Sequence, residues 1–172
     1  VPPGFVITSA AFQDFLTDLG IETLAQRKDW TQGDLERIRK LLLACRIPDR
    51  LAHSMARAYR KLGGRVAVRS SMIGEDTSTT SFAGQLDTTL NVEGKAQLLK
   101  AVNRCWASMF NWRLFSYLIA HETISSGTIL GSFSIAVVVQ RMVDARAAGV
   151  AFSADPVTGE RCVVIEAAHG LG

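Results

Sequence analysis

The hydrophobic period of this chain changes at Gly63-Gly64, and that change limits the fold classes open to it. Before the two glycines, apolar residues recur at three- and four-residue spacing in three segments, which is the pattern of amphipathic helices. After them come short β-rich runs and one further helical stretch. Because helices come mainly first and strands mainly late, the order favours an α+β fold over a repeating β-α-β fold.

Three helices are expected before residue 64. The first runs from Ser9, its expected N-cap, to Leu19. Asp34 is the expected cap of the second helix, and Pro48 fits the first turn of the third. The apolar residues expected to face the core are Phe12, Phe15, Leu16, Leu19, Leu35, Ile38, Leu41, Leu42, Leu51, Met55, Tyr59 and Leu62.

The middle of the chain, residues 65–131, is expected to be mixed. Arg65–Ser70 and Asp87–Val92 read as strands. Residues 95–121 return to a helical pattern, in two pieces with a break near Asn111, and a loop follows.

The final part, residues 132–172, is expected to be rich in strands. The nearly continuous apolar run Phe133–Val143 is typical of a central strand. Gly149–Ala154 and Arg161–Ala167 flank a linker with proline and glycine in turn-like places, which predicts a hairpin.

Composition and charge exclude several function classes. Lys and Arg number 19 against 16 Asp and Glu, and this small surplus is scattered, so nucleic-acid binding is not expected. The chain has no signal peptide and no apolar run of membrane-spanning length, so no membrane partner is expected. Cys45, Cys105 and Cys162 form neither a metal pair nor a disulfide framework, which favours a reducing, cytoplasmic location.

The segment Val66–Val92 is the strongest candidate for a phosphate-binding site. Its first strand ends in Arg69, Ser70 and Ser71. An arginine offers a permanent fork of donors, and the two hydroxyls offer more. The alternative for so short a motif is a surface arginine at an ordinary strand exit.

A long polar loop follows this arginine. Its glycines allow close backbone approach to a phosphate, and a Ser/Thr/Gly loop beside a fixed arginine is typical of a lid. The loop residues singled out are Gly74, Thr80, Ser81, Gly84 and Gln85. Gln85 either supports the loop or contacts the ligand.

The second candidate is the end of the predicted central strand, Gln140, Arg141, Met142 and Val143. Backbone polar groups beside apolar side chains suit an adenine ring. A plain core strand with a polar end explains the same composition equally well.

The motifs taken together are similar to one family. VPPGFVITSAAF, VRSSMIGEDTSTTSFAGQLDTTLNV, CWASMF, VVVQRMV, GVAFSADPVTGE and VIEAAHGLG occur in this order along the chain. They resemble the N-terminal ATP-binding domain of the phosphoenolpyruvate synthase and pyruvate phosphate dikinase family, which also occurs in rifampin phosphotransferase. The resemblance covers essentially the whole chain.

This resemblance implies an ATP-grasp fold, in which ATP lies between two α+β subdomains. It implies that Arg69 contacts the phosphates, that the loop from Gly74 to Gln85 lies over them, and that residues 140–143 lie beside the adenine. In such proteins ATP phosphorylates a histidine on a separate domain, which passes the phosphoryl group onward.

The implied function is the ATP-binding part of an ATP-dependent dikinase or phosphotransferase. Phosphoenolpyruvate synthase, which converts ATP, pyruvate and water to AMP, phosphoenolpyruvate and phosphate, is the first expectation. A rifampin-type drug phosphotransferase is the alternative in the same class. A non-catalytic nucleotide-binding or interaction module is the alternative from another class.

The chain also departs from the family pattern. The family's Gly-Gly-Lys-Gly turn, its Mg²⁺ ligands, and its phosphohistidine and pyruvate-binding domains have no counterpart in residues 1–172. We therefore expect a fragment that is inactive alone, with the Mg²⁺ ligands outside it.

Overall fold

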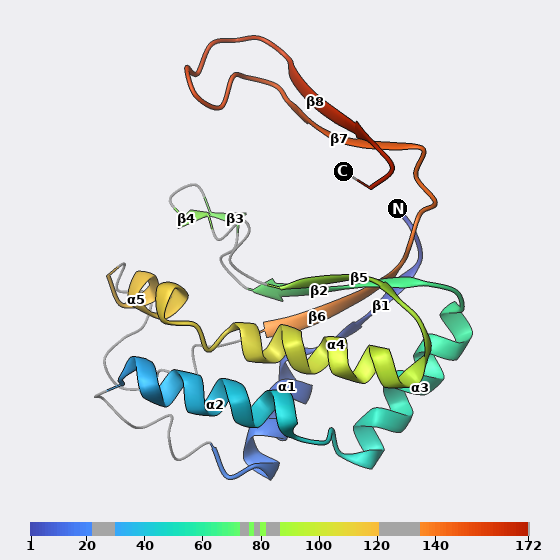
Figure 1. Cartoon of the computed structure of the whole chain (residues 1–172), viewed down its shortest axis with the longest axis vertical. Helices are drawn as coiled ribbons and strands as arrows, with labels where there is room; N and C mark the ends of the chain where they lie inside the picture. The colour runs from blue at the N-terminus through green and yellow to red at the C-terminus, as the bar shows by residue number, and fades with distance from the viewer. Residues whose placement is uncertain (22–29, 73–75, 78–79, 82–86, 121–134, 172) are drawn as a thin grey trace. The chain divides into compact units, whose positions relative to one another are not determined.

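The computed structural model describes residues 1–21, 30–72, 76–77, 80–81, 87–120 and 135–171 (Figure 1). The chain divides into two compact units, Val1–Met142 and Val143–Gly172. The predicted strand-rich part 132–172 is therefore shared between both units.

A four-stranded antiparallel sheet forms the framework of the first unit. Its strands are β1 (Gly4–Ile7), β2 (Val66–Met72), β5 (Thr88–Val92) and β6 (Ile135–Arg141), in the order β1-β6-β2-β5. The strands predicted at the positions of β2, β5 and β6 are confirmed. β6 lies between two neighbours, as its continuous apolar sequence predicts.

Three short strands of the first unit were not predicted. β1 is only four residues long, and its partner β6 lies more than a hundred residues away in sequence, with Gly4 opposite Gln140. The tiny antiparallel pair β3 (Asp76–Thr77) and β4 (Thr80–Ser81) lies in the segment expected to be a loop.

The three predicted N-terminal helices are present, but two of their caps differ from the prediction. The helices are α1 (Ser9–Asp18), α2 (Gln32–Ala44) and α3 (Asp49–Leu62). Thr8, not Ser9, is the N-cap of α1, and Thr31, not Asp34, is the N-cap of α2. Asp34 instead completes a capping box, since its carboxylate accepts a 3.0 Å hydrogen bond from the Thr31 N–H.

The later helical stretch is broken where it was expected to be. α4 (Gly94–Ser108) and α5 (Trp112–Ala120) are separate helices. Asn111 begins the second, because its side-chain oxygen accepts hydrogen bonds from Arg113 N at 2.8 Å and Leu114 N at 3.3 Å.

The helices pack against one face of the sheet (Figure 1). α4 contacts β2, β5 and β6, while α1 contacts β6, α3 contacts β1 and α2 packs on α4. Trp106 of α4 is fully buried, with ring centroids 5.5 Å from Phe12 and 5.0 Å from Phe15. Leu41 was expected in this core but is 43% exposed, because it lies beside the stripe that α2 buries.

The second unit is the predicted hairpin, with both strands shifted by two or three residues from the predicted bounds. β7 (Ala147–Phe152) pairs with β8 (Val164–His169) in antiparallel register. Asp155 organises the turn, since its carboxylate accepts hydrogen bonds from Val157 N at 2.7 Å and Thr158 N at 3.0 Å. None of the residues described in this unit is buried.

Candidate functional site

The two faces of the four-stranded sheet differ in burial, because helices cover only one of them. Successive side chains of a strand point to opposite faces, and directly paired residues share a face. Val68 and its partner Val139 are fully buried on the face that the helices cover. Arg69 pairs with Val138 on one side and Thr88 on the other, so these three lie on the opposite face.

We call this opposite side of the sheet the open face. It consists of Val6, Ala67, Arg69, Ser71, Thr88, Ala136, Val138 and Gln140. Its centre is apolar, and Val6 at its edge is 56% exposed. Ser71 and Thr88, which carry hydroxyls, are exposed residues beside this apolar floor. An apolar floor with a few polar groups around it is typical of a ligand-binding surface.

Arg69 is the cation of the open face. Its side chain is exposed, and it has no hydrogen bond or ion pair with any residue that the structure describes. Its backbone is held between two neighbouring strands, which restricts where the guanidinium can reach. A guanidinium that is fixed at its base and unpaired at its tip is suited to bind an anion.

Ser70 lies on the other side of the sheet from Arg69. It pairs with Val137 and is half-buried, and its hydroxyl donates a 3.3 Å hydrogen bond to the Asp87 carbonyl. The structure therefore brings Arg69 and Ser71 together on the open face and separates Ser70 from them. The reason is the two-residue period of the strand.

Several hydrogen-bond donors of the segment Gln140–Val143 are already bonded to other parts of the chain. Gln140 Nε2 donates to Pro2 O at 3.1 Å, and the Arg141 guanidinium donates to the Leu62 carbonyl. The backbone N–H of Arg141 donates to Pro3 O at 2.9 Å, and that of Met142 to Arg65 O at 2.9 Å. Val143 begins the second unit and is 57% exposed.

The predicted loop residues are described only in part. Thr80 and Ser81 form β4, opposite Thr77 and Asp76. Gly74, Gly84 and Gln85 lie outside the described residues.

Thr88 is a residue of the open face that the sequence interpretation missed. The strand that carries it was predicted, but its pairing partner was not. Thr88 lies directly opposite Arg69 and is exposed. The threonine-rich run Asp87-Thr88-Thr89 was the available signal, but the sequence pattern does not show which of the two threonines faces the arginine.

A buried cluster beneath Asp87 holds the start of β5. The Asp87 carbonyl accepts a 3.4 Å hydrogen bond from the Cys105 thiol, and the Asp87 N–H donates to Ser108 Oγ at 3.4 Å. Burial, together with the nearby Asp87 charge, raises the pKa of Cys105 to about 12. The thiol is therefore a protonated donor at neutral pH rather than a nucleophile.

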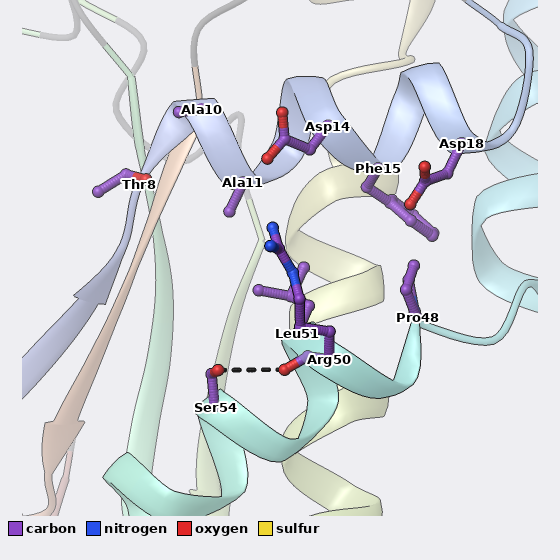
Figure 2. A pocket seen from close by; sticks show the side chains of 10 residues that line it. All are labelled: Thr8, Ala10, Ala11, Asp14, Phe15, Asp18, Pro48, Arg50, Leu51 and Ser54. Atoms are coloured by element: carbon purple, nitrogen blue, oxygen red, sulfur yellow. Dashed lines mark hydrogen bonds between the residues drawn. The ribbon is translucent and has the colours of Figure 1, made fainter.

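A cavity of about 390 Å³ lies elsewhere, between α1 and α3 (Figure 2). Figure 2 shows the Arg50 guanidinium extending from α3 toward α1, which carries Asp14 and Asp18. Two carboxylates outnumber one guanidinium here, so the charge of this cavity disfavours a polyphosphate. The open face lacks this disadvantage, because none of its residues is acidic.

Comparison with known proteins identifies the family. The model of the family described as "Pyruvate phosphate dikinase, AMP/ATP-binding domain" matches residues 1–172. The chain belongs to this family. The resemblance inferred from the sequence motifs is therefore confirmed over the whole chain.

Curated relatives include proteins with three different names. The chain is 40% identical to a rifampicin phosphotransferase from a Streptomyces species and 37% identical to a probable phosphoenolpyruvate synthase from Methanothermobacter thermautotrophicus. It is 39% identical to the prodigiosin synthesizing transferase PigC of Serratia marcescens. All of this chain is matched in each case, but it spans only 21%, 27% and 18% of those proteins, respectively.

None of the described helices is both long and apolar enough to cross a membrane.

Proposed function

We propose that the open face binds the phosphates of ATP, with Arg69 as its principal cationic contact. The observation that carries this proposal is the exposed Arg69 guanidinium, which lies on a well-anchored strand and has no partner among the described residues. Membership of an AMP/ATP-binding family supports a nucleotide as the anion. Ser71 and Thr88 flank the arginine and can donate further hydrogen bonds to phosphate oxygens.

We further propose the ATP-grasp arrangement, with residues 140–143 beside the adenine. The N–H groups of Arg141 and Met142 already donate within the chain. The Gln140 Nε2 also donates within the chain, to Pro2 O. The contribution of this segment to adenine therefore falls to the remaining polar atoms of the Gln140 amide, to the Val143 backbone and to apolar contact from Met142. Ser70 acts indirectly in this scheme, through its hydrogen bond to Asp87. Thr80 and Ser81 remain proposed phosphate-side residues on the family resemblance alone. The same holds for Gly74, Gly84 and Gln85, which lie outside the described residues.

For the whole protein we propose an ATP-dependent dikinase or phosphotransferase, first of all phosphoenolpyruvate synthase. ATP would phosphorylate a histidine on another domain, which would pass the phosphoryl group to pyruvate. The residues of this chain bind and orient the nucleotide and neutralise its charge, which is most of what a protein contributes to phosphoryl transfer. The free cysteines support a cytoplasmic location.

Mg²⁺ would assist by neutralising charge on the phosphates. The described residues contain no group of three or more His, Cys, Asp or Glu placed to hold a metal ion. On the family resemblance, we propose that its ligands lie elsewhere in the protein.

A rifampicin phosphotransferase is the second candidate, because the identities do not separate the two. The chain is 40% identical to the Streptomyces rifampicin phosphotransferase and 40% identical to the phosphoenolpyruvate synthase of Aeropyrum pernix. Incubation of the complete gene product with ATP and either pyruvate or rifampicin, followed by mass spectrometry, identifies the acceptor. ATP binding without a phosphorylated product from either would favour the non-catalytic module.

The phosphate role of Arg69 is tested by Arg69→Ala, with Arg50→Ala as a matched control. Both arginines are exposed, but Arg50 lines the cavity between α1 and α3. Loss of a charge-assisted phosphate contact is expected to weaken ATP binding by the complete gene product about tenfold or more. Arg50→Ala is expected to leave the calorimetric Kd unchanged. Equal Kd values for wild type and Arg69→Ala would refute the proposal.

A further inference from the structure

We infer that Asn91 is a positioning residue for the phosphate site, because its left-handed backbone sets which threonine faces Arg69. This inference rests on the proposed function of the open face. Asn91 has a φ of 55°, and it is the only non-glycine residue with positive φ in the described part of the chain. Its side chain is exposed and has no hydrogen bond with any described residue. The backbone conformation, rather than a side-chain contact, is therefore what the asparagine supplies.

The positive φ coincides with a bulge in the β2–β5 ladder. Val66 pairs with Val92, but Val68 pairs with Thr89. Between these pairs β2 advances by two residues and β5 by three, so β5 holds one extra residue in the stretch that contains Asn91. A residue in the left-handed conformation at such a place is a common way to form a β-bulge.

The bulge decides which side chains of β5 reach each face. A regular ladder continued from the Val66–Val92 pair would place Thr89, not Thr88, opposite Arg69. With the extra residue, Val92 is 2% exposed within the core while Thr88 is exposed beside Arg69. A strict two-residue alternation cannot place residues 88 and 92 on opposite faces.

The bulge also brings Asp87 to the cluster in α4. Asp87 adjoins Thr88, and its N–H and C=O are bonded to Ser108 and Cys105 on the covered side. Ser70, next to Arg69, donates to the same Asp87 carbonyl. A one-residue slip of β5 would break these contacts as well as exchange the threonines. Asn91 and the α4 cluster therefore favour the same register from opposite ends of the strand.

Three substitutions at position 91 of the complete gene product separate backbone conformation from other effects. Asn91→Gly retains easy access to positive φ and is expected to keep the Kd for ATP within about twofold of wild type. Asn91→Val disfavours the left-handed conformation and favours a regular strand, so ATP binding is expected to weaken about tenfold. Asn91→Ala is expected to lie between them, and it serves as the test variant if the valine variant does not fold.

Two readouts distinguish positioning from a general loss of stability. Cross-strand NOEs in selectively labelled protein should connect Arg69 with Thr88 in wild type and in Asn91→Gly, and shift toward Thr89 in Asn91→Val. In the Arg69→Ala background, Asn91→Val should cause little further loss of ATP affinity, because the residue it positions is already absent.

The possible failures are distinct. If Arg69→Ala weakens ATP binding but Asn91→Val and Asn91→Ala only lower Tm, Asn91 is structural and this inference is wrong, while the proposed function stands. If Asn91→Gly weakens binding as much as Asn91→Val, the asparagine side chain matters and the inference is also wrong. If Arg69→Ala itself has no effect, the proposed function fails and the inference fails with it.

Discussion

The four-stranded sheet of the first unit and the two-stranded sheet of the second bury very different amounts of side chain. Val66, Val68, Val137 and Val139 in the first sheet are fully buried beneath the helices. In the second, Phe152 is 40% exposed and Ile165 is 70% exposed. Both sheets are antiparallel, although the β2–β5 ladder of the first contains a bulge. Backbone pairing is therefore common to them, and burial is what differs.

This difference indicates where the stability of the described chain resides. A two-stranded hairpin alone is marginally stable in water, because backbone hydrogen bonds to a partner strand largely replace bonds to water. Burial of apolar surface supplies the main driving force for folding. We therefore expect the first unit to determine the unfolding transition of residues 1–172 and the second to contribute little.

The sharpest test of this comparison deletes the same atoms from a leucine in each unit. Leu98 of α4 is fully buried, whereas Leu171 in the second unit is 45% exposed. Leu98→Ala is expected to lower the free energy of unfolding by about 2–5 kcal/mol, through lost transfer energy and a cavity. Leu171→Ala is expected to change it by less than about 0.5 kcal/mol.

Urea denaturation of residues 1–172, followed by circular dichroism, measures both values. Similar losses in the two variants would contradict the comparison, because they would show that the hairpin is as well packed as the core.

A smaller effect is expected from the cysteines, of which each unit offers one for comparison. Burial raises the pKa of Cys105 to about 12 from an ordinary value of 9.0. Between these values the unfolded thiol loses its proton while the native thiol keeps it, so stability should fall as pH rises. The slope is at most about 1.4 kcal/mol per pH unit.

The measurement is the difference in free energy of unfolding between wild type and Cys105→Ser, taken at several alkaline pH values. That difference should shrink as pH rises through this window. Cys162→Ser is the control, because Cys162 is exposed in the second unit. A pH dependence identical in wild type and Cys105→Ser would show that the thiol is not the group responsible.

The smallest effect is expected in the turn of the second unit. Backbone hydrogen bonds from Thr158 and Val157 lower the pKa of Asp155 below its ordinary value. A lowered native pKa stabilises the turn above the ordinary pKa, and this contribution is lost as pH falls through the lowered value. The amide chemical shifts of Val157 and Thr158 should follow that titration in NMR spectra, and Asp155→Asn should abolish it.

The acid titration should leave the core of the first unit unchanged. If the amide chemical shifts of the buried valines of β6 followed the same titration as those of the turn, the two units would be energetically coupled. The comparison would then need revision.

Long periodic segments were predictable from the sequence alone. The apolar stripe of α3 and the continuous apolar run of β6 each persist over enough residues to identify an element. β1 failed this condition, since four residues carry little periodic signal and its partner β6 is remote in sequence. The Ser9 and Asp34 caps were misplaced by one and three residues. For α2 the neighbouring Thr31 offered a competing cap, whereas the Thr8 side chain makes no capping hydrogen bond, so no side-chain signal marked the start of α1.

The candidate site was predictable in its residue types but not in its geometry. Arg69 was singled out because an arginine ends a buried strand before a polar loop. Strand pairing then determined that Ser71 and Thr88 share its face and that Ser70 does not. Pairing depends on the bulge near Asn91, which follows from one backbone angle and leaves no trace in the hydrophobic pattern.

The alternation along β2 and β6 also has an evolutionary consequence. Arg69 and Ser71 of β2 and the even positions of β6 face away from the helical core, so substitution there alters the surface offered to a ligand more than it disturbs the core. Selection for ligand recognition and selection for stability thus act on different residues, which alternate along the same strands. A directed-evolution library confined to positions 69, 71, 88, 138 and 140 would vary the ligand-binding surface, and the selected variants would keep the parental core.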